Sequence, residues 1–254
     1  MHDQAIVREF SHQADRFVVA PVMRSLETLH TVVQCAVRAG ARGVWTEVAC
    51  GPAIVGGALA RHVETVLAVD LTPAMLAAGQ REVASRGLTH VYFLRGDATT
   101  LPFRDGVLNG AITRFSFHHI PAPQRVLQEM ARVVQRDGLV VVADHVTTAD
   151  SAGMAWHQQI ERLRDPSHWA CLPIAAFEYM GERCRLELVE TVTLPFRVDY
   201  EEWLMRGTGG EQYRTLIEDL VAMSEGIEEF HIASDASGIR WLHAKLFVGV
   251  WRKL

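Results

Sequence analysis

Short apolar runs alternate with helical patterns over the first 145 residues of the chain. Five runs have the length and composition of β-strands: residues 44–50, 65–70, 90–97, 107–115 and 139–145. The last run is apolar without alternation, which is typical of a parallel strand covered on both faces. Helical patterns lie between the runs, at residues 53–62, 72–87 and 121–138. Repeated βα units of this kind predict a doubly wound parallel sheet.

Individual residues mark where several helices begin and end. Thr72 is a predicted N-cap, and Pro73 follows it at a position where proline's missing N–H is not needed. Gly138 is expected to end the helix that starts near residue 121. Apolar residues at helical spacing predict a further amphipathic helix over residues 21–38.

The regular alternation of short apolar runs and helical patterns ends after residue 145. Residues 151–180 have a helical pattern although they contain two prolines, and residues 211–223 are again helical. Two β-rich runs lie far apart, at residues 186–198 and 244–251. Strands this late suit a pair that closes the sheet, and the helices around them suit a lid over one end of it.

These patterns predict an α/β protein with a Rossmann-like, doubly wound, seven-stranded sheet, a C-terminal antiparallel edge strand and a helical lid. We expect one domain. Its predicted parts are an N-terminal helical cover at 1–40, a ligand-binding core at 41–145, a lid at 146–185 and 200–238, and closing strands at 186–198 and 244–252.

Charge and composition exclude several classes of protein. The net charge is −5 and no basic run exists, so nucleic acid is a poor partner. No apolar stretch approaches the roughly 20 residues of a membrane helix, and the charged N-terminus does not resemble a secretory signal. The four cysteines are widely spaced without a Cys-x-x-Cys pair, so we expect neither a metal site nor disulfides. A cytoplasmic location fits best.

Three residues stand at successive strand ends, where open α/β sheets bind their ligands. Gly51 follows the first strand and allows close approach of the backbone to a ligand. Asp70 ends the second strand, 19 residues later, where an acid accepts hydrogen bonds from ribose hydroxyls. Asp97 follows the third strand. Each alone could be ordinary turn chemistry, but the three in order predict a nucleoside pocket.

A dinucleotide-dependent dehydrogenase is the rival interpretation. It would prefer the pattern Gly-x-Gly-x-x-Gly, but Ala53 occupies the second glycine position. None of the four tyrosines is followed by the lysine of a Tyr-x-x-x-Lys dyad. Both observations disfavour this class.

Residues 44–145 resemble the S-adenosylmethionine (SAM)-binding core of class I methyltransferases. They are most similar to the small-molecule methyltransferases of the ubiquinone and menaquinone biosynthesis type. The matching segments are EVACGPA, AVDLTPAML, GDATTLPF, RFSFHHI and LVVVADH. The resemblance extends to FSHQADRF near the N-terminus and to ERLRDPSHW at residues 161–169.

The resemblance implies that SAM is the cofactor and implies its binding residues. These are Glu47, Ala49 and Gly51 beside the methionine moiety, Asp70 at the ribose, Leu71 and Met75 beside the adenine, Asp97 and Ala98 at its amino group, Arg114 near the methionine and Phe10 above the cofactor. Ala49 and Ala53 depart from the family, which often has glycine at both positions. Ala49 is tolerable if its φ is negative, whereas Ala53 narrows the approach to the cofactor.

Candidate acceptor-site residues follow the fourth and fifth strands and lie in the lid. His119 and His145 are candidates for a general base, because an imidazole titrates near neutrality. His118, Trp156, Arg162 and Trp169 are candidates for substrate contact. The histidines could instead shape the pocket, and the lid aromatics could form the lid's own core.

The sequence therefore predicts a SAM-dependent methyltransferase acting on an aromatic, isoprenoid or other secondary-metabolite acceptor. The alternative is an enzyme that keeps the SAM pocket but performs cyclisation, decarboxylation or SAM fragmentation. A non-catalytic binding module is a third hypothesis, disfavoured by the presence of both Asp70 and Asp97. Monomer and homodimer both remain open.

Overall fold

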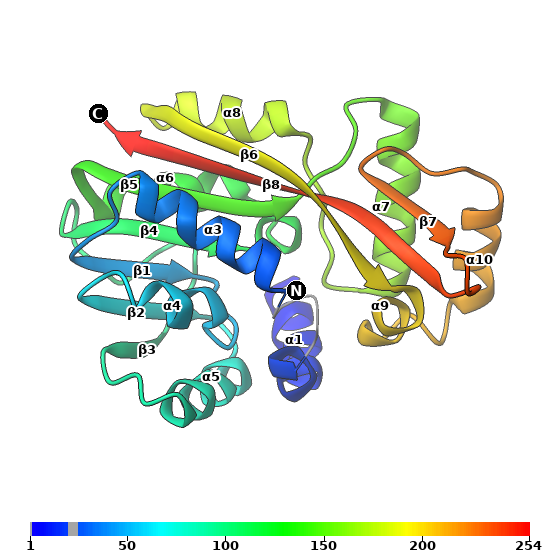
Figure 1. The fold of residues 1–254 in the computed structure, drawn as a ribbon, viewed down its shortest axis with the longest axis horizontal. Helices are drawn as coiled ribbons and strands as arrows, with labels where there is room; N and C mark the ends of the chain where they lie inside the picture. The colour runs from blue at the N-terminus through cyan, green and yellow to red at the C-terminus, as the bar shows by residue number, and fades with distance from the viewer. Residues whose placement is uncertain (1, 20–24) are drawn as a thin grey trace.

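The computed structural model describes residues 2–19 and 25–254. Its central sheet has the strand order β3-β2-β1-β4-β5-β8-β6, and β7 pairs with β8 outside this path (Figure 1). The strands are β1 (Val44–Val48), β2 (Thr65–Asp70), β3 (Val91–Arg95), β4 (Leu108–Arg114), β5 (Val134–His145), β6 (Leu186–Asp199), β7 (Phe230–Ser234) and β8 (Arg240–Lys253).

The predicted Rossmann-like fold class is confirmed. Strands β1 to β5 pair in parallel, whereas β8 pairs antiparallel with both β5 and β6. The antiparallel strand is C-terminal, as predicted, but it lies one position in from the edge, and β6 is the edge strand. The eighth strand, β7, lies within residues 200–238, where the sequence predicted only helices.

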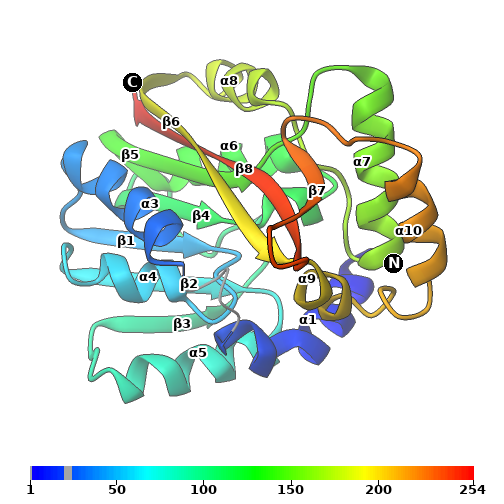
Figure 2. The ribbon, with the colours of Figure 1, turned by 45° about the vertical axis from the view of Figure 1, so that its right-hand side comes forward.

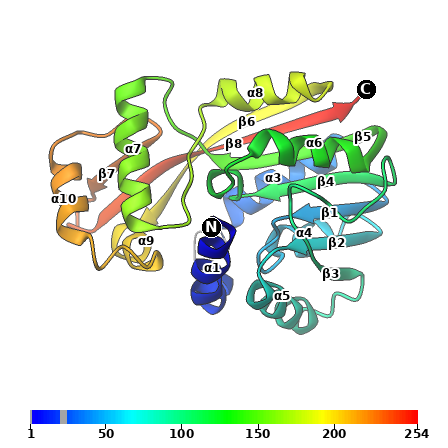
Figure 3. The same ribbon diagram turned by 180° about the vertical axis from the view of Figure 1, so that it is seen from behind.

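Helices flank both faces of the sheet (Figure 3). They are α1 (His2–Val19), α3 (Leu26–Arg38), α4 (Ile54–Leu59), α5 (Pro73–Ser85), α6 (Pro123–Val133), α7 (Ser151–Arg164), α8 (Ile174–Arg183), α9 (Tyr200–Arg206) and α10 (Arg214–Ala222), with a 3₁₀ turn, η1, at Phe117–His119. None of the described helices is long and apolar enough to cross a membrane.

The alternation of side chains along β5 divides the core into two layers. Val141 and Ala143 belong to the cluster that α3 and α4 cover, whereas Val140 and Val142 belong to the cluster under α6 and α8. All four side chains are fully buried. Because both faces are covered, the run from Leu139 to Ala143 in β5 is apolar without alternation, as the sequence predicted.

The remaining elements gather at the carboxyl ends of the parallel strands. Helices α7, α9 and α10 stand together with β7 beyond that edge of the sheet (Figure 2). Their own core contains Tyr200, Trp203 and Phe230. Helix α1 lies between this group and the sheet, packed against α5 (Figure 1).

Several predicted boundaries differ from the structure. Helix α6 ends at Val133 rather than at Gly138, because the chain passes directly into β5 and Gly138 lies inside that strand. The helical pattern over 151–180 is two helices, α7 and α8, separated by an irregular segment. Residues 21–24 of the helix predicted over 21–38 lie outside the described residues.

Candidate functional site

A cavity of about 270 Å³ opens at the carboxyl ends of β1 to β4. The residues that the family resemblance assigned to the cofactor converge here with one exception, Glu47. Those that line the cavity are Phe10, Ala49, Gly51, Asp70, Leu71, Met75, Asp97, Ala98 and Arg114. Parallel strands present their ends at one edge, so segments distant in sequence meet there.

The turn between β1 and α4 is held in a left-handed conformation. Ala49 (φ 49°), Gly51 (φ 51°) and Ala53 (φ 55°) all have positive φ. The condition under which Ala49 would be tolerated without strain, a negative φ, is therefore not met. A left-handed conformation costs an L-residue roughly 1–2 kcal/mol, so both alanines strain the turn. At Gly51 a Cβ would lie 3.8 Å from the Met75 sulfur, in the cavity wall.

Glu47 supports this turn from below rather than lining the cavity. Its Oε2 accepts the backbone N–H of Gly56 in α4 at 2.7 Å, and the side chain is buried. A Cβ on Gly56 would come within 2.5 Å of that oxygen, which explains the glycine. Burial raises the pKa of Glu47 to about 8, against the N–H of Gly56 and the charge of Arg114. The predicted cofactor contact is thus replaced by a role in positioning α4.

The Asp70 carboxylate lies across the base of the cavity. Its Oδ2 accepts the N–H of Gly51 at 2.7 Å, and its Oδ1 accepts the N–H of Thr72 at 2.8 Å. Burial raises the pKa of Asp70, whereas these backbone donors lower it. Asp97 is exposed, and its Oδ1 accepts the N–H and Oγ1–H of Thr99. One buried and one exposed acid thus face the same space.

These features fit a nucleoside-containing cofactor such as SAM. The cavity offers a backbone turn without a side chain at Gly51, an anchored acid at Asp70 and a second acid at Asp97. Acids at these two strand ends suit hydrogen bonding to ribose hydroxyls and to an amino group. Phe10 and Met75 supply apolar walls between them.

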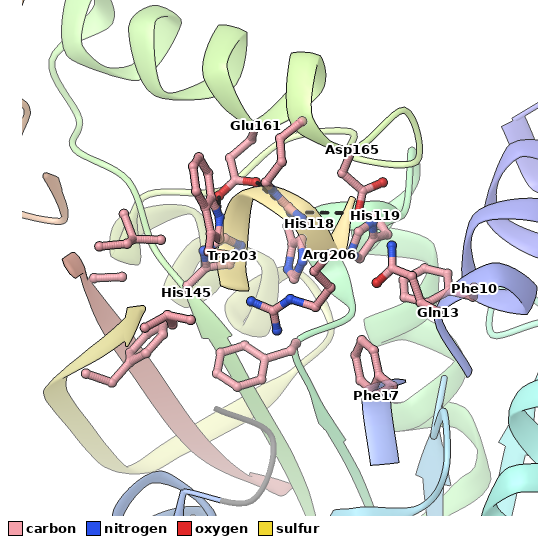
Figure 4. Close-up of a pocket in the computed structure, with 16 residues that line it drawn as sticks. Phe10, Gln13, Phe17, His118, His119, His145, Glu161, Asp165, Trp203 and Arg206 are labelled. Atoms are coloured by element: carbon pink, nitrogen blue, oxygen red, sulfur yellow. Dashed lines mark hydrogen bonds and ion pairs between the residues drawn. The ribbon is translucent and has the colours of Figure 1, made fainter. Parts of the chain in front are cut away.

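A second, smaller cavity of about 70 Å³ adjoins the first. The two share four lining residues, Phe10, Phe17, Phe115 and His119. Polar and apolar residues together line the rest of the smaller cavity (Figure 4). Its polar lining consists of Gln13, His118, His145, Glu161, Arg164, Asp165 and Arg206.

His118 is oriented by a carboxylate. Its Nδ1 lies 2.6 Å from Asp144 Oδ1, and its backbone N–H donates to Asp144 Oδ2 at 3.2 Å. Burial lowers the pKa of His118 well below the ordinary value, so the ring is neutral at neutral pH. Since a carboxylate only accepts, Nδ1 carries the proton and Nε2 keeps a lone pair.

His119 is oriented through a hydroxyl. Ser167 Oγ donates to Asp165 Oδ1 at 2.6 Å and lies 3.0 Å from His119 Nδ1. The hydroxyl proton is used on Asp165, so Nδ1 of His119 donates to Ser167 and its Nε2 is a free acceptor. Burial raises the pKa of Asp165, but the charge of Arg164 and the hydrogen bonds from Ser167 hold it below its ordinary value.

His145 meets a thiol instead. Its Nε2 lies 3.2 Å from Cys171 Sγ, and burial lowers the pKa of its ring well below the ordinary value. Donor atoms of His145, His157 and Cys171 lie within 4.8 Å of one another, and so do those of His118, Asp144 and His145. Both groups could hold a metal ion. The sequence predicted no metal site, because the members of each group come from separate segments of the chain. The thiol–imidazole hydrogen bond already pairs Cys171.

Three of the four predicted substrate contacts lie elsewhere. Trp156 Nε1 donates to Leu220 O at 2.8 Å, so this ring belongs to the lid core. Arg162 donates to the carbonyl of Trp169 through Nε (3.0 Å) and a terminal nitrogen (2.6 Å). Trp169 is 43% exposed and contacts His2 edge-on. Of these four residues, only His118 lines either of the two adjoining cavities.

Two residues that line this cavity from the lid, Glu161 and Arg206, were not indicated by the sequence. Glu161 and Arg164 are three apart on α7 and so share one helical face, from which Arg162 points away. Trp203 and Arg206 are likewise three apart on α9. This spacing was available as a signal, but nothing in the sequence indicates which helical face meets the sheet.

Residues 46–142 match the family model of a methyltransferase domain. An uncharacterized methyltransferase, YcgJ, from Bacillus subtilis (strain 168) is 26% identical over 183 residues, which are 71% of this chain and 72% of that protein. Demethylmenaquinone methyltransferase from Clavibacter sepedonicus is 25% identical over 185 residues, 72% of each. The crystal structure of BH2331 from Bacillus halodurans C-125 superposes with a TM-score of 0.81 at 24% identity, covering 89% of this chain and 98% of that one. Two geranyl diphosphate methyltransferases that share the fold, with TM-scores of 0.63 and 0.62 at 13% and 14% identity, were solved with SAM and with S-adenosylhomocysteine (SAH), respectively.

Proposed function

We propose that this chain transfers a methyl group from SAM to a small molecule bound in the smaller cavity, because residues 46–142 match the model of a methyltransferase domain. SAM would occupy the larger cavity, and helices from residues 146–185 and 200–238 would enclose the acceptor within a single domain. The observation that carries this proposal is the wall that the two cavities share.

When bound, SAM supplies an electrophilic methyl group, so the protein needs to align the acceptor and exclude water. The shared aromatic residues Phe10, Phe17 and Phe115 are placed to do both. Positioning of two reactants can lower a barrier by about 7–11 kcal/mol at best. The apolar rings also keep water from the space between acceptor and cofactor.

We assign the role of general base to His119. It lines both cavities, and its Nδ1 is anchored on Ser167, which leaves Nε2 to accept a proton from the acceptor. His145 lines only the smaller cavity, where Cys171 lies within 3.2 Å of its Nε2. His118, held by Asp144, would orient the acceptor's polar group beside it.

Methyl-labelled SAM and a panel of small hydroxylated and amino acceptors test the proposal. We expect a product heavier by one methylene and one equivalent of SAH. We expect His119→Ala to lower kcat by about 10²–10⁴-fold on a protonated acceptor, the usual contribution of a general base, while SAH still binds. His62→Ala, an exposed histidine, is the matched control. An unmethylated product, or the formation of methylthioadenosine, would contradict methylation and support the alternative reactions, namely cyclisation, decarboxylation or SAM fragmentation.

A further inference from the structure

Arg206 extends from α9 into the smaller cavity, which His118 and His145 also line (Figure 4). Its Nε is buried without a hydrogen-bond partner. No ion pair joins Arg206 to any acid among residues 2–19 and 25–254. Burial lowers the pKa of Arg206 to about 10, and the charge of Arg164 acts in the same direction. The side chain is still a cation at neutral pH.

The acids around Arg206 are engaged elsewhere or do not reach it. Glu161 Oε2 accepts Nε and a terminal nitrogen of Arg164, at 3.0 and 2.8 Å. Asp165 accepts two hydrogen bonds from Ser167 and lies 3.7 Å from Arg164. Glu202, one turn earlier on α9, has its Oε1 buried without a partner and forms no ion pair with Arg206. Arg164 therefore has a direct ion-pair partner in Glu161, whereas the charges of Glu202, Glu161 and Asp165 act on Arg206 without a direct ion pair in the described part of the chain.

The backbone around Arg206 is fixed on two sides. The N–H of Gly209 donates to the Arg164 carbonyl at 2.9 Å, and a Cβ on Gly207 would lie 2.2 Å from that carbonyl oxygen. Thr208 donates its N–H and its hydroxyl to the Glu9 carboxylate of α1, at 2.9 and 2.6 Å. Arg206 thus projects from a segment held against both α7 and α1. The backbone that carries Arg206 is thereby ordered before a ligand binds, which lowers the entropy cost of binding.

We propose that Arg206 binds an anionic group of the methyl acceptor, a carboxylate or a phosphate. A guanidinium presents planar donors that match such oxygens, and a charge without a partner in a water-poor site gains most from an anionic ligand. The acceptor is accordingly a small organic anion whose nucleophilic atom lies toward His119 and the larger cavity. The cavity volume of about 70 Å³ suits a compact molecule rather than a long prenyl chain.

This inference rests on the proposed function, and binding measurements separate the two. Protein saturated with SAH is titrated with benzoate, with phenyl phosphate and with neutral benzyl alcohol. We expect one of the two anions to bind, and we expect Arg206→Gln to weaken its binding at least tenfold. Benzyl alcohol is expected to bind no more weakly to the variant than to the wild type. The preferred anion distinguishes a carboxylate acceptor from a phosphate acceptor.

Arg162→Gln is the matched control, because Arg162 already donates to the Trp169 carbonyl outside this cavity. Arg206→Lys keeps the positive charge, and we expect it to retain part of the affinity for the anion. This variant tests the inference if Arg206→Gln folds poorly. Equal anion affinity in wild type and Arg206→Gln would overturn the inference. Failure of both anions to bind a wild type that holds SAH would also overturn it. Failure of SAH itself to bind would contradict the proposed function instead.

Discussion

The Asp70 carboxylate accepts the backbone N–H of Gly51 at 2.7 Å, which ties the end of β2 to the turn after β1. The two residues meet because β1 and β2 are adjacent parallel strands, with Val48 opposite Val69. One side chain thereby fixes the shape of the turn and presents its charge to the larger cavity. The cofactor site depends on this pair.

We expect Asp70→Asn to weaken SAH binding roughly 10- to 100-fold, because hydrogen bonds to a charged group contribute about 1.5–3 kcal/mol. The amide would also direct a donor toward one of two backbone N–H groups. Isothermal titration with SAH measures the change. Asp97→Asn is the comparison, with a smaller loss because Asp97 is exposed. Wild-type affinity in Asp70→Asn would contradict the role of the pair.

Ala49→Gly should stabilise the protein. Relief of the left-handed strain at φ 49° should raise the free energy of unfolding by roughly 1–2 kcal/mol. The greater backbone freedom of glycine in the unfolded chain should lower it by about 0.4–1 kcal/mol. The expected net gain is about 0.5–1 kcal/mol in the free energy of unfolding, measured by urea denaturation. Ala77→Gly, at an exposed position inside α5, should instead destabilise by about 0.5–1 kcal/mol. A loss of stability in both variants would mean that Ala49 is not strained.

His157 should make the stability depend on pH. Burial lowers the pKa of its ring from 6.5 to about 4. Between these values the unfolded chain binds a proton that the folded protein does not, so stability is lost as the pH falls below 6.5. The loss from this one group is up to about 1.4 kcal/mol per pH unit.

The test compares unfolding free energies of wild type and His157→Leu from pH 7 to pH 4. We expect the variant to have the flatter profile, although it is less stable at pH 7 because it loses the contacts to Thr147 and Phe230. Phe177→Leu, a buried substitution without a titrating group, should shift the whole curve without changing its slope. Parallel curves for wild type and His157→Leu would refute this account.

Glu9 should hold α1 over both cavities. Its carboxylate accepts two hydrogen bonds from Thr208 and one from Gln13. We expect Glu9→Ala to speed SAH dissociation about tenfold and to increase amide hydrogen exchange in α1, since Phe10 of this helix lines both cavities. Arg8→Ala, on the exposed face of the same helix, should change neither quantity. Unchanged exchange in Glu9→Ala would show that α1 is held by other contacts.

The sequence predicts the cofactor side of the site better than the acceptor side. Gly51, Asp70 and Asp97 stand at strand ends, and the topology alone brings strand ends together. Glu47 was misassigned because sequence position cannot tell a side chain that lines a turn from one that supports it. The sign of φ at Ala49 is likewise set by the turn's tertiary contacts.

Prediction of the acceptor side failed for a different reason. Trp156 and Arg162 were chosen for their chemistry, but the face that α7 presents to the cavity is set by how the lid packs, and it carries Glu161 and Arg164. Arg206 lies beyond the closing strand β6 and joins the site only through the lid's packing. β7, a strand of five residues, also depends on pairing with β8 rather than on its own pattern.

A crystal structure of the protein soaked with SAH tests the central claim most directly. The account predicts electron density in the larger cavity, with the ribose hydroxyls within hydrogen-bonding distance of Asp70, the adenine beside Asp97 and the sulfur facing the smaller cavity. An adenosyl group bound elsewhere, or a sulfur directed away from His119 and Arg206, would contradict it.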